Sequence, residues 1–122
     1  MTDKSLRDRA IDIKGKKYVQ VADRIIYFNE TYQNGSIETE IISPVDADRV
    51  VIKATITINK EGQPDRRFAA HSQALWGDGF INKTSAIENC ETSAVGRALA
   101  LMGIGVIDSV ASVDEIEKAH IA

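Results

Sequence analysis

The 122-residue sequence has one cysteine, two histidines and no excess of positive charge. Cys90 cannot form an internal disulfide, so a hydrophobic core must hold the fold together. His71 and His120 lie outside any HxH, CxxC or HExxH spacing, which argues against a metal site, and no cofactor is expected. The longest apolar runs fall far short of the ~20 residues needed to span a bilayer. These features exclude disulfide-rich, metal-dependent and membrane-spanning classes.

Charge is distributed unevenly along the chain. The net charge of −3 argues against a generally basic nucleic-acid binder. Residues 1–24 hold seven Lys/Arg against four Asp, whereas residues 106–122 hold four acids against one lysine. Any phosphate site must therefore be a local patch. The N-terminal residues lack the basic-then-apolar layout of a signal peptide, so we expect a cytoplasmic protein.

A long helix is predicted over Asn82–Gly105, and the chain is organised around it. Ser85 and Glu88 have the capping-box spacing, which places the start of the helix there, and Gly103 is typical of a helix end. Gly96 inside a helix costs ~1 kcal/mol relative to alanine, which favours a close approach by another backbone; a plain core helix is the alternative. The apolar stripe comprises Ile87, Cys90, Ala94, Ala98 and Leu101.

Hydrophobic periodicity predicts the remaining elements. The first is a helix at Tyr18–Gln33, with Asp23, Arg24 and Glu30 facing water. Three strands follow, at Ser36–Ser43, Arg49–Asn59 and Arg66–Leu75. The last is a short helix at Ser112–His120, in which Ser112 and Glu115 repeat the capping-box spacing. Thr2–Lys17 is expected to be polar with a turn at Lys14–Lys17, and Trp76–Phe80 to be a glycine-rich loop. The fold class is therefore α+β: a helix, a curved three-stranded antiparallel sheet covered on one face, a long helix and a short C-terminal helix.

Three classes of function remain open from the residues alone. A small enzyme could use His71 with Glu38 or Glu40 in a pocket, although no phosphate loop or serine elbow is present. An interaction module could use the exposed sheet edges or the acidic C-terminal segment. Single-stranded nucleic acid needs cations along its backbone and flat side chains against its bases. The candidates for that role are Arg97, Lys83, Arg66, Arg67, Lys14, Lys16, Lys17 and Trp76; the alternatives are edge charges, solvated lysines and a core tryptophan.

A family resemblance favours the third class. The run KKYVQVADRIIYFNETYQ at Lys16–Gln33, three strands, and then SAIENCETSAVGRALALMGIG together resemble the single-strand annealing protein superfamily. That superfamily includes phage recombination annealases and the eukaryotic annealing mediator, and the resemblance is strongest to short phage and prophage members with an ETSAVGRALA-type helix. It covers Lys14–Gly105 and depends on the GRALALMG helix end and the element order.

The resemblance implies a βββα core that forms homo-oligomeric rings or filaments and anneals single-stranded DNA in a basic groove. By position, Arg97 faces that groove, Lys83, Arg66 and Arg67 line it, and Lys14–Lys17 lies where the chain enters the first helix. It implies no enzyme activity, a bacterial host cell, and a phage exonuclease or a host single-strand-binding protein as further candidate partners. The domain would span 1–122, with an annealase-like core at 14–105 and an acidic segment at 106–122. A phage protein-interaction module without DNA binding is the alternative.

Overall fold

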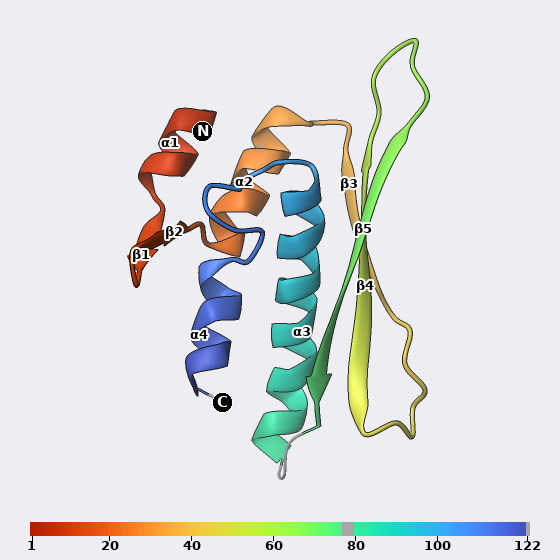
Figure 1. Ribbon diagram of the computed structural model, residues 1–122. Coiled ribbons are helices and arrows are strands. Elements are labelled where there is room, and N and C mark those ends of the chain that lie inside the picture. The colour runs from red at the N-terminus through yellow and green to blue at the C-terminus, as the bar shows by residue number, and fades with distance from the viewer. Residues whose placement is uncertain (77–79, 122) are drawn as a thin grey trace.

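The protein has two layers and a small N-terminal addition. The computed structural model describes the backbone of residues 1–76 and 80–121, and the side chains there except at 80–84 and 118–121. Helices α2 (Val21–Thr31), α3 (Phe80–Leu101) and α4 (Val113–Ile121) lie on one side of a three-stranded sheet (Figure 1). The α+β prediction is confirmed. No helix in the described part of the chain is long and apolar enough to cross a membrane.

The sheet has one covered face and one open face. Strands β3 (Ser36–Ile41), β4 (Arg49–Ile58) and β5 (Arg66–Leu75) pair antiparallel in the order β3-β4-β5. Alternate residues of β4 are buried beneath the helices, namely Val50, Ile52, Ala54 and Ile56. The intervening side chains point to the open face, as the alternation in the sequence predicted. The predicted bounds of β5 agree with the structure, and those of β3 and β4 differ only at their C-terminal ends.

Helix α3 packs along β4 and β5 and supplies much of the core. Cys90 is fully buried and its thiol donates to the carbonyl oxygen of Ser72 at 3.2 Å, so its predicted core role is confirmed. The predicted helix start is wrong, because α3 begins at Phe80 and Ser85 lies inside it, where N-terminal amides are no longer free. Gly103 follows the helix with φ 91°, as predicted for a helix end. The loop residues Gly77–Gly79 lie outside the described residues.

Gly96 marks the place where α2 crosses α3. A Cβ added at Gly96 would lie 2.5 Å from Cγ2 of Val21, which is itself fully buried. The neighbouring positions Ser93 and Ala100 are also buried. The packing role predicted for this glycine is therefore confirmed, but the approaching group is the Val21 side chain of α2 and not another backbone.

Replacing Gly96 with alanine is expected to lower the free energy of unfolding by about 1 kcal/mol. Overpacking costs about 1–3 kcal/mol and the gain in helix propensity offsets about 1 kcal/mol of it. Urea denaturation followed by circular dichroism measures the change. In a Val21→Ala background the same substitution should be stabilising, because the obstructing methyl group is gone. A loss of equal size in both backgrounds would contradict the packing account.

Arg24 links α2 by hydrogen bonds to α3 and to the segment that joins α3 and α4. Its side chain is fully buried, and its guanidinium donates to the carbonyl oxygens of Gly96 (2.9 Å), Val110 (3.2 Å), Gly105 (3.3 Å) and Ala111 (3.3 Å). Burial lowers the pKa of Arg24, while nearby carboxylates act in the opposite direction. The expectation that Asp23 and Arg24 face water is wrong, because Asp23 is buried beside Arg9 and the connector folds back over Arg24.

The segment before α2 and the start of α4 meet at the N-terminal end of α2. Ser112 caps α4 through a bond from the Glu115 amide to its hydroxyl at 3.3 Å, as its capping-box spacing predicted. Asp114 accepts the Val21 amide at 2.9 Å and so caps α2 across the fold. The polar N-terminal segment contains more structure than expected: α1 (Asp3–Asp8), β1 (Ile11–Ile13) and β2 (Lys16–Tyr18). This unit packs beside the helices on the side away from the sheet (Figure 1).

Candidate nucleic-acid interface

The N-terminal hairpin, residues 11–18, presents three lysines at one exposed tip; we call it the lysine hairpin. Ile13 pairs with Lys16, which leaves a two-residue turn of Lys14 (φ 53°) and Gly15 (φ 86°). These φ values are those of a type I′ turn. The side chains of Lys14, Lys16 and Lys17 are all exposed. Because Lys14 is held in a left-handed conformation that is unfavourable for a residue with a Cβ, the turn stores strain where its charge is displayed.

The lysine hairpin is fixed to the rest of the protein at its base. The Lys17 amide donates to Asp108 at 2.8 Å, and Gly15 donates its amide to Asp12 at 3.0 Å. Val19 is fully buried and accepts the Val113 amide at 3.1 Å. None of the ion pairs found among the described side chains uses the three lysines. The hairpin is therefore an anchored support that presents its ammonium groups to solvent.

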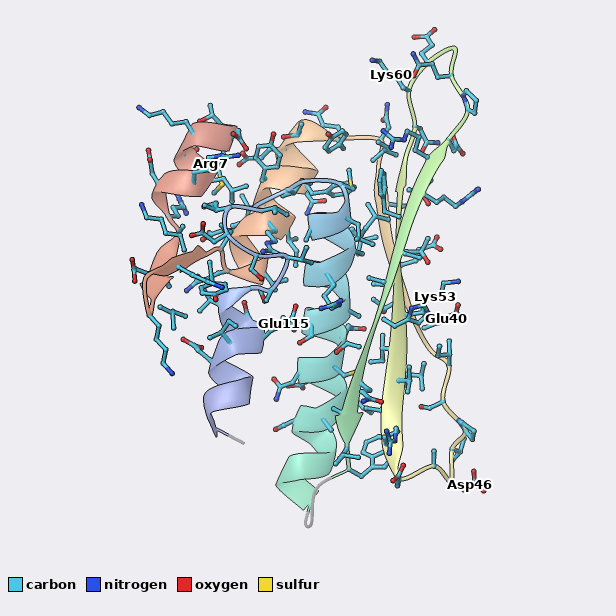
Figure 2. The ribbon with its side chains drawn as sticks, viewed as in Figure 1. Arg7, Glu40, Asp46, Lys53, Lys60 and Glu115 are labelled. Carbon is cyan, nitrogen blue, oxygen red and sulfur yellow. The ribbon has the colours of Figure 1, made fainter. Side chains whose placement is uncertain are left out.

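The open face of the sheet carries charges of both signs. Lys53 lies between Glu40 and His71 in the strand register, and Figure 2 shows Lys53 and Glu40 together on the side away from the helices. Arg67, near the start of β5, is also exposed. Arg66 beside it lies with its guanidinium 4.9 Å from the centre of the Phe68 ring. The basic groups of this face therefore lie on β4 and β5 and its acidic groups on β3, whereas Arg66 and Phe68 belong to the opposite, helix-facing set of β5 residues.

Arg97 and His71 meet at the edge of the sheet. With Ala69, Ala70, Leu101 and Val110 they line a pocket of about 300 Å³ between β5 and α3. Arg97 also forms an ion pair with Glu115 of α4 at 3.4 Å. Lys83 belongs to the first turns of α3, but its side chain lies outside the described residues.

Trp76 directly follows β5 and is half-buried against the core, and its amide donates to the Asp48 carbonyl oxygen at 3.1 Å. The lysine hairpin and β5, which begins with Arg66 and Arg67, lie on opposite sides of the helical layer (Figure 1). Among the predicted contact residues whose side chains the structure describes, there is therefore no continuous groove within a single chain. Among the described residues, no group of His, Cys, Asp and Glu is arranged to hold a metal ion.

Comparison with protein families gives a match over residues 25–102 to the family described as Slr1353 N-terminal dsRNA-binding domain-like. The chain belongs to this family. The match begins within α2 and ends one residue after α3, so it covers the unit α2-β3-β4-β5-α3. The lysine hairpin and α4 lie outside it. Comparison with curated proteins finds no match.

The expected membership of the single-strand annealing superfamily is wrong, because the family that matches is a different one. The order of elements that supported it, a helix, three strands and a long helix, is present in the structure. Element order and one helix motif do not separate families with different activities. The family found here supports nucleic-acid binding in general terms, and it does not indicate strand annealing or phage recombination.

Proposed function

We propose that the protein binds double-stranded RNA. The observation that carries the proposal is the match of residues 25–102, which runs from within α2 through β3, β4 and β5 to the end of α3, to a family described by its likeness to dsRNA-binding domains. Proteins recognise an RNA double helix mostly by its shape and by its phosphate and 2′-hydroxyl groups. Such recognition needs cations on well-anchored elements, and it needs no deep base pocket, metal or catalytic group.

The lysine hairpin is the element best suited to the phosphates. The net charge of −3 means that general attraction does not favour RNA, so binding depends on a local cluster. Lys14, Lys16 and Lys17 form such a cluster on an anchored turn. In this proposal they contact one strand of the duplex while the family core supplies the remaining surface.

Competition among nucleic acids tests the proposal. Protein bound to a labelled RNA duplex is challenged with unlabelled RNA duplex, DNA duplex of the same sequence, and each single strand. The RNA duplex should compete at the lowest concentration, because only it has both A-form geometry and 2′-hydroxyl groups. More effective competition by either single strand or by the DNA duplex would overturn the assignment of substrate. Failure to bind any of the four would instead favour an interaction module.

Replacing Lys14 with asparagine should separate stability from binding. Asparagine tolerates the left-handed conformation and Asn-Gly is favoured in type I′ turns, so the free energy of unfolding should rise by about 0.5–1 kcal/mol. RNA affinity should fall, and the salt dependence of log K should become shallower by about one. Thermal denaturation and binding isotherms measure the two effects. Unchanged affinity would show that Lys14 does not contact phosphate.

A further inference from the structure

The two edges of the sheet carry opposite charges. Strand β3 displays Glu38 and Glu40 on the open face and contains no basic residue. Beneath it, Glu91 of α3 accepts the Thr39 hydroxyl at 2.7 Å. Strand β5 contains no acidic residue and begins with Arg66 and Arg67. Beneath β5, α3 presents Arg97 beside the pocket that His71 also lines. On the sheet, the β3 edge is therefore acidic and the β5 edge basic; on the helix below, Glu91 lies under β3, and Arg97 under β5 is paired with Glu115.

The β5 edge is also available for backbone pairing. The Trp76 amide donates to the carbonyl oxygen of Asp48, which directly precedes β4. The even-numbered residues of β5 therefore also direct their amides towards β4. The alternate residues Arg67, Ala69 and His71 direct theirs to the outer edge. No strand pairs with this edge among the described residues, and the ten-residue strand contains no proline. An exposed edge of this kind is a template for another strand.

A pocket adjoins each edge. The pocket between β5 and α3 has exposed apolar walls at Leu101 and Val110, with Arg97 beside them. The pocket between β3 and α3 has a volume of about 270 Å³ and is lined in part by Ile37, Thr39 and Glu91. The inward side chains of an added strand would enter the first pocket. The inward side chains of β3 are apolar or small, and so they suit the apolar walls of the pocket between β5 and α3.

We propose that β5 of one copy pairs in parallel with β3 of a second copy, which extends the sheet across the two molecules. Since β3 and β5 run parallel within one sheet, this arrangement keeps the helices of both copies on the same face. Glu38 and Glu40 of the second copy then lie in the same open layer as Arg67 and His71. Each copy retains one free edge, so the contact is heterologous and can repeat. This self-association does not depend on RNA binding.

The charges select this pairing over the alternatives. Pairing β5 with the β5 of another copy places two basic edges together. Pairing β3 with the β3 of another copy places the glutamates of both copies together. Juxtaposed like charges disfavour a contact, whereas complementary potentials favour it and fix its register. The contact between the acidic β3 edge and the basic β5 edge is therefore the favoured one.

Reciprocal charge reversal tests the proposal. Nuclease-treated wild-type protein should show a sedimentation mass that rises above the monomer with concentration at low salt. Glu40→Arg and Arg67→Glu should each remain monomeric, and an equimolar mixture of the two should associate again, because each variant retains one compatible edge. Glu117→Arg, on α4, makes the same charge change away from the edges and should behave as wild type. A monomeric wild type, or single variants that assemble normally, would overturn the proposal.

A backbone substitution separates strand pairing from general charge attraction. In Ala69→Pro the outward amide is lost while the bonds between β5 and β4 remain, so the sheet should persist in circular dichroism. Association should disappear in sedimentation. If the folded proline variant associates as wild type does, the copies do not meet through the β5 edge. Duplex RNA binding is measured separately on the same monomeric variants, so a failure of either proposal leaves the other testable.

Discussion

Replacing Arg24 with alanine is expected to lower the free energy of unfolding by about 3–5 kcal/mol. The guanidinium satisfies four buried or partly buried carbonyl oxygens that belong to α3 and the connector after it. Alanine leaves those oxygens without donors and opens a cavity between α2 and α3. Urea denaturation at several pH values near neutrality measures the loss.

Two variants provide the controls for Arg24. Arg7→Ala removes an exposed arginine that pairs with Asp3 one helical turn away, and it should cost about 0.3–0.5 kcal/mol. Arg24→Lys retains the charge but lacks the planar fork that reaches several carbonyls, so it should fall between wild type and alanine. If Arg24→Ala were no more destabilising than Arg7→Ala, the connector would not depend on this side chain.

Replacing Lys14, Lys16 and Lys17 together with alanine should weaken duplex RNA binding on the order of 100-fold at low salt. Each phosphate contact releases counterions, so the loss of three should reduce the salt slope of log K by about 2–3. The unfolding free energy should change little, because the three ammonium groups are exposed and form no ion pair among the described side chains. Fluorescence anisotropy across a salt series measures both quantities.

The matched control removes the same charge elsewhere. Lys4→Ala, Lys53→Ala and Lys60→Ala together lower the net charge equally, but these residues lie on α1, on the open face and in the β4–β5 loop. This variant should keep most of the affinity and nearly the wild-type salt slope. Equal losses in both triple variants would mean that net charge, rather than the lysine hairpin, governs binding.

The central elements were predictable because their signals are local and long. Strict alternation in β4 and β5 predicted both strands and their inward faces. Gly96 predicted a site of close packing, although its partner, Val21 of α2, could not be identified from the sequence. The start of α3 was missed because a capping-box spacing can occur inside a helix. The three-residue strands of the lysine hairpin are too short to show a period.

Long-range contacts account for the other differences. Arg24 resembles a surface residue on a helical pattern, yet residues 72–87 positions away in the chain enclose it. The lysines of the hairpin could be identified from composition, but their anchor, Asp108, lies 91 positions from Lys17 and gives no local signal. The position of the hairpin across the helices from Arg66 and Arg67 is likewise a tertiary property. The family was misassigned because its element order was predicted correctly and then treated as specific.

The measurement that tests the central claim most directly is the titration of a labelled RNA duplex of about 16 base pairs with wild-type protein at several salt concentrations. The account predicts saturable binding at low salt, with log K falling linearly against log salt and a slope of about −3 or steeper for contacts that include three lysines. Absence of binding at the lowest salt, or binding that does not change with salt, would contradict the proposal that this protein holds the phosphates of double-stranded RNA.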